Sequence, residues 1–147
     1  MNWSRLFPKG EEYTGSKIPF YFLILIAVIS TVRSLIHIFA ADGGAHSIAG
    51  ISVNVAGGTN IIAMFAQWGA SQLVLAVIYW FVILRYRSLT PLMFAVIVLE
   101  QLLRMGAGNL KPLEIAAPPP GALGSQIILP LTAVALVWSL WQNNQKS

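Results

Sequence analysis

The chain has 147 residues, of which 56% are hydrophobic and only 10% charged, whereas an ordinary soluble domain is about 25% charged. This composition indicates a membrane protein, and the length fits a single domain over residues 1–147. The chain has no cysteine, which excludes disulfides, thiolate nucleophiles, cysteine-bound metal clusters and palmitoyl anchors. The net charge of +4 does not predict a nucleic-acid partner, because the basic residues flank apolar runs instead of forming a stripe with aromatic residues.

Four apolar runs are long enough to cross a hydrocarbon core about 30 Å thick, which takes about 20 helical residues. They cover residues 18–41, 60–84, 90–107 and 124–141. They predict an all-α fold, an integral membrane four-transmembrane-helix bundle. Residues 1–17 precede the first run as a cytoplasmic or interfacial lead. Because this polar lead and the apolar run after it are both too long for a signal peptide, we expect the first helix to be retained.

The lysines and arginines beside these runs predict the orientation, since positive residues in short loops stay on the cytoplasmic side. Those before the first run, in the turn between the second and third, and at the end of the chain are Arg5, Lys9, Lys17, Arg85, Arg87 and Lys146. The other two loops hold only Lys111. We therefore expect both termini in the cytoplasm, loops 42–59 and 109–123 outside, and a location in a prokaryotic inner membrane.

The two outer loops differ in kind. The first has glycine pairs at both ends and apolar residues at every second position, Ile51, Val53 and Val55. This pattern predicts a short strand or hairpin on the outer surface. The second is rich in proline and predicts an extended polyproline segment that turns at Gly121. Either the loops cover the outer end of the bundle or they only connect the helices.

Polar side chains interrupt three of the four runs at a similar depth. A rise of about 1.5 Å per residue places Arg33 and Arg104 about 21 to 22 Å from the inner edge, and Gln67 about 10 Å below the outer edge. Each has a second polar residue four positions away, so each pair shares one helix face. We predict that these faces meet and form a ligand-binding site from Arg33, His37, Gln67, Ser71, Glu100 and Arg104.

The charges in this layer do not balance, because Glu100 offsets only one of the two arginines. A buried charge costs about 2.5 to 3.5 kcal/mol on insertion scales. Three interpretations remain open. The arginines reach outer head groups, or Asp42 or Glu114 folds back from an outer loop as a counter-ion. In the third, the arginines and Gln67 hold an anionic or carbonyl-bearing ligand such as a lipid head group, a fatty acid or a quinone.

Most catalytic and metal-binding patterns are missing. The two histidines are His37 and His46, and because His46 lies in an outer loop, neither a bis-histidine haem nor another metal site is predicted. The spans hold no lysine for a Schiff base and no HExxH or GxSxG motif. We expect a non-enzymatic protein with a bound lipid or quinone as its only candidate cofactor. The alternative is a membrane enzyme of the isomerase or proton-transfer type, acting on a lipid-like substrate, in which Glu100 is the general acid or base and His37 its complement.

The layout resembles the DoxX-like small membrane proteins and related four-helix families of uncharacterised function. The likeness covers residues 18–141 and rests on four spans with both ends inside, a long first outer loop, the turn "RYRSLTPL", an arginine late in the third span and a proline in the fourth. It implies a binder of a lipid or quinone-like ligand, or an accessory subunit of a larger membrane complex. The partners would then be membrane lipid, other membrane subunits or a second copy of the chain. A second likeness, to four-helix sterol isomerases that enclose a ligand with buried acidic groups, supports only the enzyme alternative, because the spans here hold one carboxylate.

Overall fold

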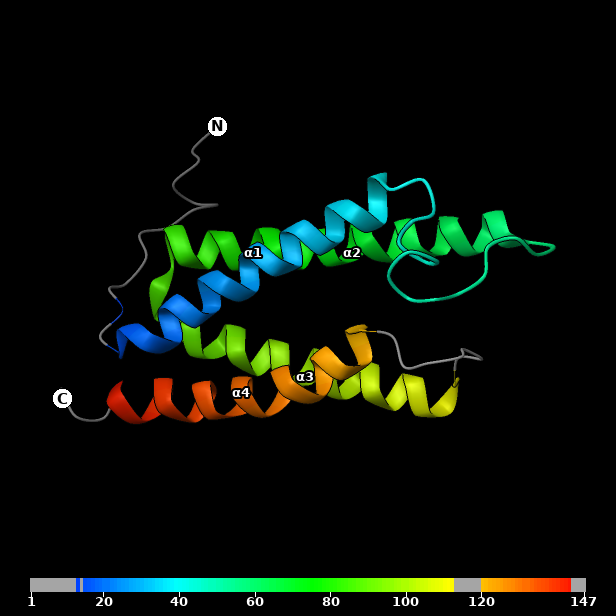
Figure 1. The fold of residues 1–147 in the computed structure, drawn as a ribbon. Helices are drawn as coiled ribbons and strands as arrows, with labels where there is room; N and C mark the ends of the chain where they lie inside the picture. The colour runs from blue at the N-terminus through cyan, green and yellow to red at the C-terminus, as the bar shows by residue number, and fades with distance from the viewer. Residues whose placement is uncertain (1–12, 14, 113–119, 144–147) are drawn as a thin grey trace, which may run out of the picture.

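The computed structural model describes residue 13 and residues 15–112 and 120–143, without the side chains of 120–123 and 141–143. These residues form four α-helices and one short 3-10 turn, in the order α1 (Lys17–Phe39), α2 (Gly58–Leu84), η2 (Arg87–Leu89), α3 (Thr90–Leu110) and α4 (Pro120–Asn143) (Figure 1). The described part of the chain contains no strand. The predicted all-α bundle is therefore confirmed.

Three of the four described helices have the length and composition of membrane spans. Three segments, Lys17–Phe39, Gly58–Leu84 and Arg87–Leu110, have 23, 27 and 24 residues and are apolar enough to cross a bilayer, which takes about 20 residues. The fourth apolar segment that the structure describes, Gly124–Leu140, is shorter. By length and composition this is a membrane protein.

The helix boundaries follow local signals in the sequence. The Ser16 side chain accepts a hydrogen bond from the Ile18 backbone nitrogen at 3.3 Å and so caps α1. Gly57 precedes α2 with a φ of +84°, a left-handed conformation that glycine adopts without strain. Residues 120–124 are helical, so the predicted polyproline conformation is wrong at this end of the second loop, where Pro120 is the first helical residue. Proline is well suited to that position because its fixed φ is helical. Residues 113–119, which belong to the same prediction, lie outside the described residues.

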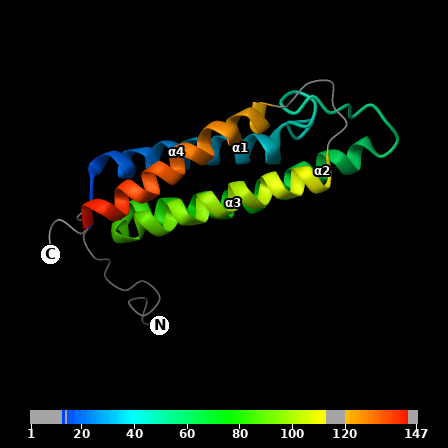
Figure 2. The same ribbon diagram turned by 90° about the horizontal axis from the view of Figure 1, so that it is seen from below.

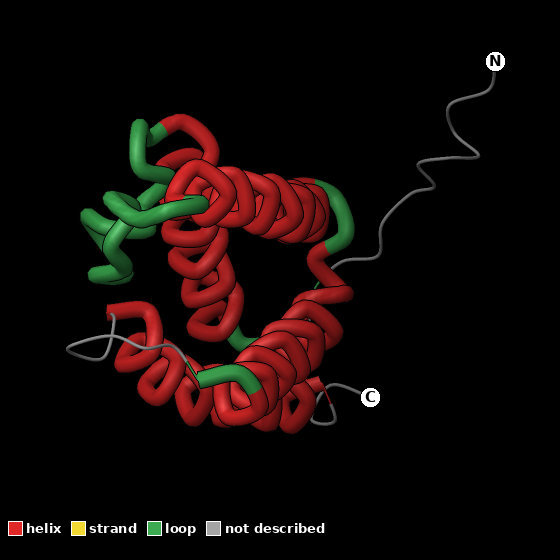
Figure 3. Tube along the Cα trace, turned by 90° about the vertical axis from the view of Figure 1, so that its right-hand side faces the viewer, coloured by secondary structure: helices red, strands yellow, loops and turns green. Residues whose placement is uncertain are grey.

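The bundle consists of two helix hairpins. In the N-terminal hairpin α1 packs along α2, in the C-terminal hairpin α3 packs against α4, and contacts between the hairpins are sparser. Figure 2 shows the C-terminal hairpin as one layer in front of the other. The start of α1 and the end of α4 lie at the same end of the bundle as η2, which we call the turn end (Figure 1). Residues 40–57 lie at the opposite end, the loop end, from which Figure 3 looks along the helices.

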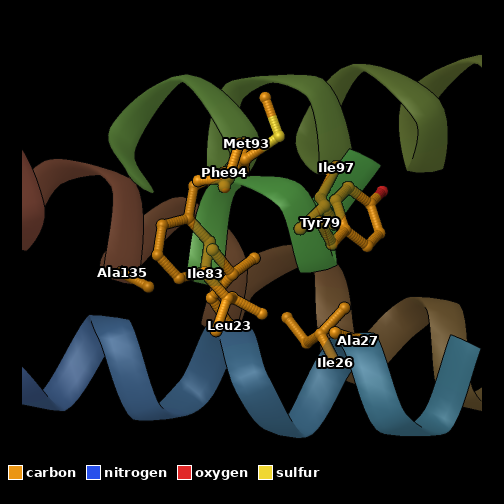
Figure 4. Packing of buried hydrophobic residues seen from close by; sticks show 10 residues of the cluster. Leu23, Ile26, Ala27, Tyr79, Ile83, Met93, Phe94, Ile97 and Ala135 are labelled. Atoms are coloured by element: carbon orange, nitrogen blue, oxygen red, sulfur yellow. The ribbon is translucent and has the colours of Figure 1, made fainter. Parts of the chain in front are cut away.

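The hydrophobic core fills the half of the bundle near the turn end. Every helix contributes, as Figure 4 shows, and the buried cluster consists of Leu23, Ile26, Ala27, Tyr79, Val82, Ile83, Met93, Phe94, Ile97 and Ala135. Leu23 and Phe94 are completely inaccessible, and Phe94 stacks on Phe22 with ring centroids 6.0 Å apart. On α2 and α3 this core ends at Tyr79 and Ile97. The interior beyond these two residues, toward the loop end, contains polar and aromatic side chains.

A glycine allows the two helices of the N-terminal hairpin to approach closely in the other half. A Cβ atom built on Gly69 would lie 2.6 Å from the Cβ of His37 and 3.1 Å from the carbonyl oxygen of Ser34. Small residues at such crossings let membrane helices gain dispersion contacts along their backbones. Nearer the turn end, the Trp80 indole donates a hydrogen bond of 3.1 Å to the Thr31 hydroxyl and joins the same two helices.

The first loop is a compact turn organised by Asp42. Its carboxylate accepts hydrogen bonds from the backbone nitrogens of Gly44 at 2.9 Å, His46 at 3.2 Å and Ser47 at 2.6 Å. The bonds from Ser47 and Gly44 hold the pKa of Asp42 well below its ordinary value. Residues Gly43 and Gly44 have φ values of +60° and +73°, which permit the sharp reversal. The predicted strand or hairpin is therefore wrong: the loop bonds to a side chain at its start instead of to a second strand.

Candidate functional site

His37 fastens the first loop to the helices. Its side chain is buried, with 3% of its surface exposed, and its Nδ1 lies 2.7 Å from the Gly43 carbonyl oxygen. Because a carbonyl oxygen only accepts, Nδ1 carries the hydrogen in this bond. The imidazole ring also packs against Trp68 and Phe65, with centroid distances of 4.8 and 5.6 Å. These contacts position the loop and Trp68 relative to α1.

Trp68 lies between charged groups from both hairpins. The guanidinium carbon of Arg33 on α1 is 5.1 Å from the centroid of its ring, and that of Arg104 on α3 is 5.2 Å away. A guanidinium over an aromatic ring contributes about 0.5–1 kcal/mol when exposed and about 2 kcal/mol or more when desolvated. The Trp68 indole, on α2, therefore stabilises both arginines. It links the N-terminal hairpin to the C-terminal hairpin, because Arg33 lies on α1 and Arg104 on α3.

Glu100 is surrounded by donors. Its Oε1 lies 3.6 Å from Arg104 Nη1, one turn along α3, and accepts a hydrogen bond of 3.3 Å from Gln72 Nε2 on α2. Its Oε2 accepts from Gln101 Nε2 at 3.0 Å. The ion pair expected from the spacing of Glu100 and Arg104 is present, and Gln72 ties it to the other hairpin.

We call this group the polar cluster. Its members share contacts with Trp68 or Glu100 and come from three helices: Arg33, Trp68, Gln72, Glu100, Gln101 and Arg104. Three of the predicted site residues, Arg33, Glu100 and Arg104, thus meet in one place. The fourth, His37, reaches the cluster through the ring of Trp68.

Gln67 and Ser71 lie elsewhere. Both are exposed, and the Ser71 hydroxyl donates to the backbone carbonyl of Gln67 at 3.2 Å. The face of α2 that meets the arginines is shifted by one residue and carries Trp68 and Gln72, which are also four positions apart. The described contacts with the arginines and Glu100 thus come from Trp68 and Gln72, because depth along a helix does not fix rotation about its axis, and one residue turns the face by about 100°. A role of Gln67 and Ser71 in ligand binding stays a prediction.

Gln101, like Trp68 and Gln72, belongs to the cluster but was not among the predicted site residues. It is 8% exposed, and while its Nε2 donates to Glu100, its Oε1 has no hydrogen-bond partner among the described residues. A buried amide oxygen without a donor is unfavourable. The site therefore contains an acceptor that remains to be satisfied.

The polar cluster also carries an excess positive charge, because two arginines face one carboxylate. Asp42 does not supply the second negative charge, since its carboxylate is bound by the backbone of its own loop. Glu114 lies outside the described residues. Both arginine side chains fold onto Trp68, and Arg104 retains 26% of its side-chain exposure. An anion at these guanidinium groups would balance the cluster.

Nothing in the described residues points to a metal centre, since no three histidine, cysteine, aspartate or glutamate side chains come together there.

The structure also shows an open apolar hollow of about 500 Å³ on α4, lined by Ala133, Val134, Val137 and Trp138. Its described lining is almost entirely apolar. No protein-family model, curated protein or solved structure matches this chain.

Proposed function

We propose that this chain is an integral membrane four-helix bundle, similar in layout to the DoxX-like proteins, that binds the polar head of a membrane amphiphile without transforming it. The ligand is a lipid or a quinone-like molecule with anionic or strongly electron-rich oxygen atoms. Its binding site is the polar cluster, and all four helices cross the bilayer with the loop end outside. The turn end, which holds Arg85 and Arg87, then faces the cytoplasm as the distribution of positive residues predicts.

The observation that carries this proposal is the pair of guanidinium groups over Trp68, for which Glu100 is the one carboxylate in contact among the described residues. A charged side chain in a bilayer costs about 2.5 to 3.5 kcal/mol. Arg104 regains part of this cost from Glu100, whereas Arg33 has the indole ring and no described carboxylate contact. An oxygen-rich anionic head group next to Arg33 would compensate the remaining charge.

Binding fits the geometry better than catalysis does. A general acid or base needs a carboxyl group that can meet a substrate proton, but both oxygens of Glu100 already accept hydrogen bonds from amide side chains. His37, its expected complement, donates to the first loop. Both carboxylate oxygens of Glu100 and Nδ1 of His37 are thus engaged in holding the bundle and the loop together.

The experiment that tests the proposal is native mass spectrometry of the full chain after extraction in mild detergent, with identification of bound lipids. The wild-type protein should retain an anionic amphiphile. The fraction of Arg33→Gln protein that carries this amphiphile should be at least tenfold lower. Lys111→Gln is the matched control, because it removes an exposed positive charge just beyond α3, and it should bind like the wild type. Equal occupancy in wild type and Arg33→Gln would overturn the proposal, as would a wild-type protein that retains no amphiphile.

A further inference from the structure

The unsatisfied acceptor in the polar cluster limits the chemistry of the head group. Gln101 is nine-tenths buried, and its Oε1 has no donor among the described residues. The orientation of its amide is fixed, because the Nε2 end faces the Glu100 carboxylate at 3.0 Å and an oxygen there would be repelled. A ligand that lies against the arginines and also donates a hydrogen bond would satisfy Oε1.

The packing beyond the cluster limits the rest of the ligand. Next to it, toward the turn end, Ile97 is 2% and Tyr79 4% exposed, and Phe94 and Leu23 are fully buried below them. Interiors packed in this way leave no room for a hydrocarbon chain. A ligand therefore places its head group in the cluster while its chains stay in the surrounding lipid.

We propose, on the basis of the function proposed above, that the ligand is a membrane phospholipid whose head group combines one negative charge with a hydroxyl donor. The single charge matches the excess of one guanidinium over one carboxylate in the cluster. A phosphodiester oxygen bridges Arg33 and Arg104, and a head-group hydroxyl donates to Gln101 Oε1. Phosphatidylglycerol has both features, whereas a fatty-acid carboxylate has the charge but no donor, and a quinone has neither.

Four probes separate these features in lipid-binding titrations followed by native mass spectrometry. Dioleoyl phosphatidylglycerol has the negative charge and the hydroxyl groups. Dioleoyl phosphatidylmethanol has the same charged phosphodiester but no hydroxyl. Dioleoyl phosphatidylcholine has neither a net charge nor a hydrogen-bond donor. Glycerophosphoglycerol is the soluble head group without its acyl chains. The wild type should bind phosphatidylglycerol about threefold to tenfold more tightly than phosphatidylmethanol, the range expected for one hydrogen bond, and phosphatidylcholine most weakly.

Variants assign the two features to residues. Gln101→Met keeps the length of the side chain and should remove the discrimination between phosphatidylglycerol and phosphatidylmethanol. Gln67→Met is the matched control, since it removes an exposed amide side chain on α2 outside the polar cluster and should keep the discrimination. Arg33→Gln should weaken binding of both anionic lipids toward that of phosphatidylcholine.

The outcomes distinguish this inference from the proposed function. If the wild type binds phosphatidylglycerol and phosphatidylmethanol equally, and both more tightly than phosphatidylcholine, the inferred hydroxyl contact is wrong and anion binding stands. If all three lipids bind equally, both proposals are wrong. Glycerophosphoglycerol should bind at least tenfold more weakly than the lipid, and equal binding would exclude the membrane as the source of the ligand. The comparison of lipids on the wild type decides the question even if Gln101→Met fails to fold.

Discussion

Gly69 provides the sharpest test of how the N-terminal hairpin is packed. In Gly69→Ala the added Cβ would lie 2.6 Å from the Cβ of His37, whereas carbon atoms in contact prefer about 3.5–4.0 Å. The two helices must separate by about 1 Å, which also moves His37 relative to Trp68. The nearest atom belongs to a Cβ fixed to the backbone of α1, so side-chain rotation does not relieve the overlap.

The expected magnitude follows from two opposing effects. Overpacking costs about 1–3 kcal/mol, while replacing glycine by alanine in a helix gains up to about 1 kcal/mol. Gly106→Ala on α3 isolates the second effect, because a Cβ atom built there meets nothing within 4 Å. Since both variants share the gain in helix propensity, Gly69→Ala should be less stable than Gly106→Ala by about 1–3 kcal/mol, the overpacking cost alone.

The assay is reversible unfolding in mixed micelles of mild detergent and increasing dodecyl sulfate, followed by circular dichroism. Gly106→Ala should match or exceed the wild-type free energy of unfolding, and Gly69→Ala should fall below it. If the two alanine variants are equally stable, the close approach of α1 and α2 at Gly69 is not a packing constraint, and the argument fails.

Three further predictions concern single contacts. Replacing Trp68 with leucine removes two cation–π contacts worth about 0.5–2 kcal/mol each, so the unfolding free energy should fall by about 1–4 kcal/mol. Thr31→Val removes the acceptor for the Trp80 indole and should cost about 0.5–1.5 kcal/mol, with a shift in tryptophan emission. The pKa of Asp42 is depressed in the folded loop, so the loop gains stability above the ordinary aspartate value of about 3.9 and loses it as the pH falls toward the folded value. The Ser47 amide resonance should therefore stay constant from pH 7 to about pH 4 and move only in stronger acid.

Each of these predictions has a result that contradicts it. Trp68→Phe should keep part of the stability because a phenyl ring also attracts cations, although less strongly than indole. Equal losses in the phenylalanine and leucine variants would contradict the cation–π argument. Unchanged emission in Thr31→Val would mean that the Trp80 bond is absent in solution. A Ser47 resonance that titrates near pH 4 would show that Asp42 is not held by the loop.

Much of the fold was predictable because long apolar runs constrain a chain strongly. The predicted first three runs, 18–41, 60–84 and 90–107, correspond to helices 17–39, 58–84 and 90–110. The errors arose in the loops, where one pattern supports several structures. The alternation of Ile51, Val53 and Val55 suggested a strand, but the Asp-Gly-Gly sequence at 42–44 was the stronger signal, because an aspartate side chain readily bonds to the following backbone.

The depth of the polar layer was predictable, but the residues that α2 contributes to it were not. Four-residue spacings identified the ion pair of Glu100 and Arg104 on one helix. On α2 the same rule selected Gln67 and Ser71 instead of Trp68 and Gln72, because it counted only polar residues and Trp68 is aromatic. A tryptophan at the depth of two arginines was a usable signal, since indole is the best aromatic partner for a guanidinium.

The division into two hairpins has a consequence for how the chain is assembled in a membrane. If the chain spans the membrane as proposed and is inserted from its N-terminus, Arg33 would enter the bilayer with α1 and α2, before Glu100 has been synthesised. Trp68 belongs to that first hairpin and lies 5.1 Å from the guanidinium, so the earlier insertion intermediate already contains a partner for its charge. Arg104 arrives later together with Glu100, one turn away on the same helix. Each half of the molecule thus carries a partner for its own arginine, and we expect the contacts between the halves to form when the two hairpins dock.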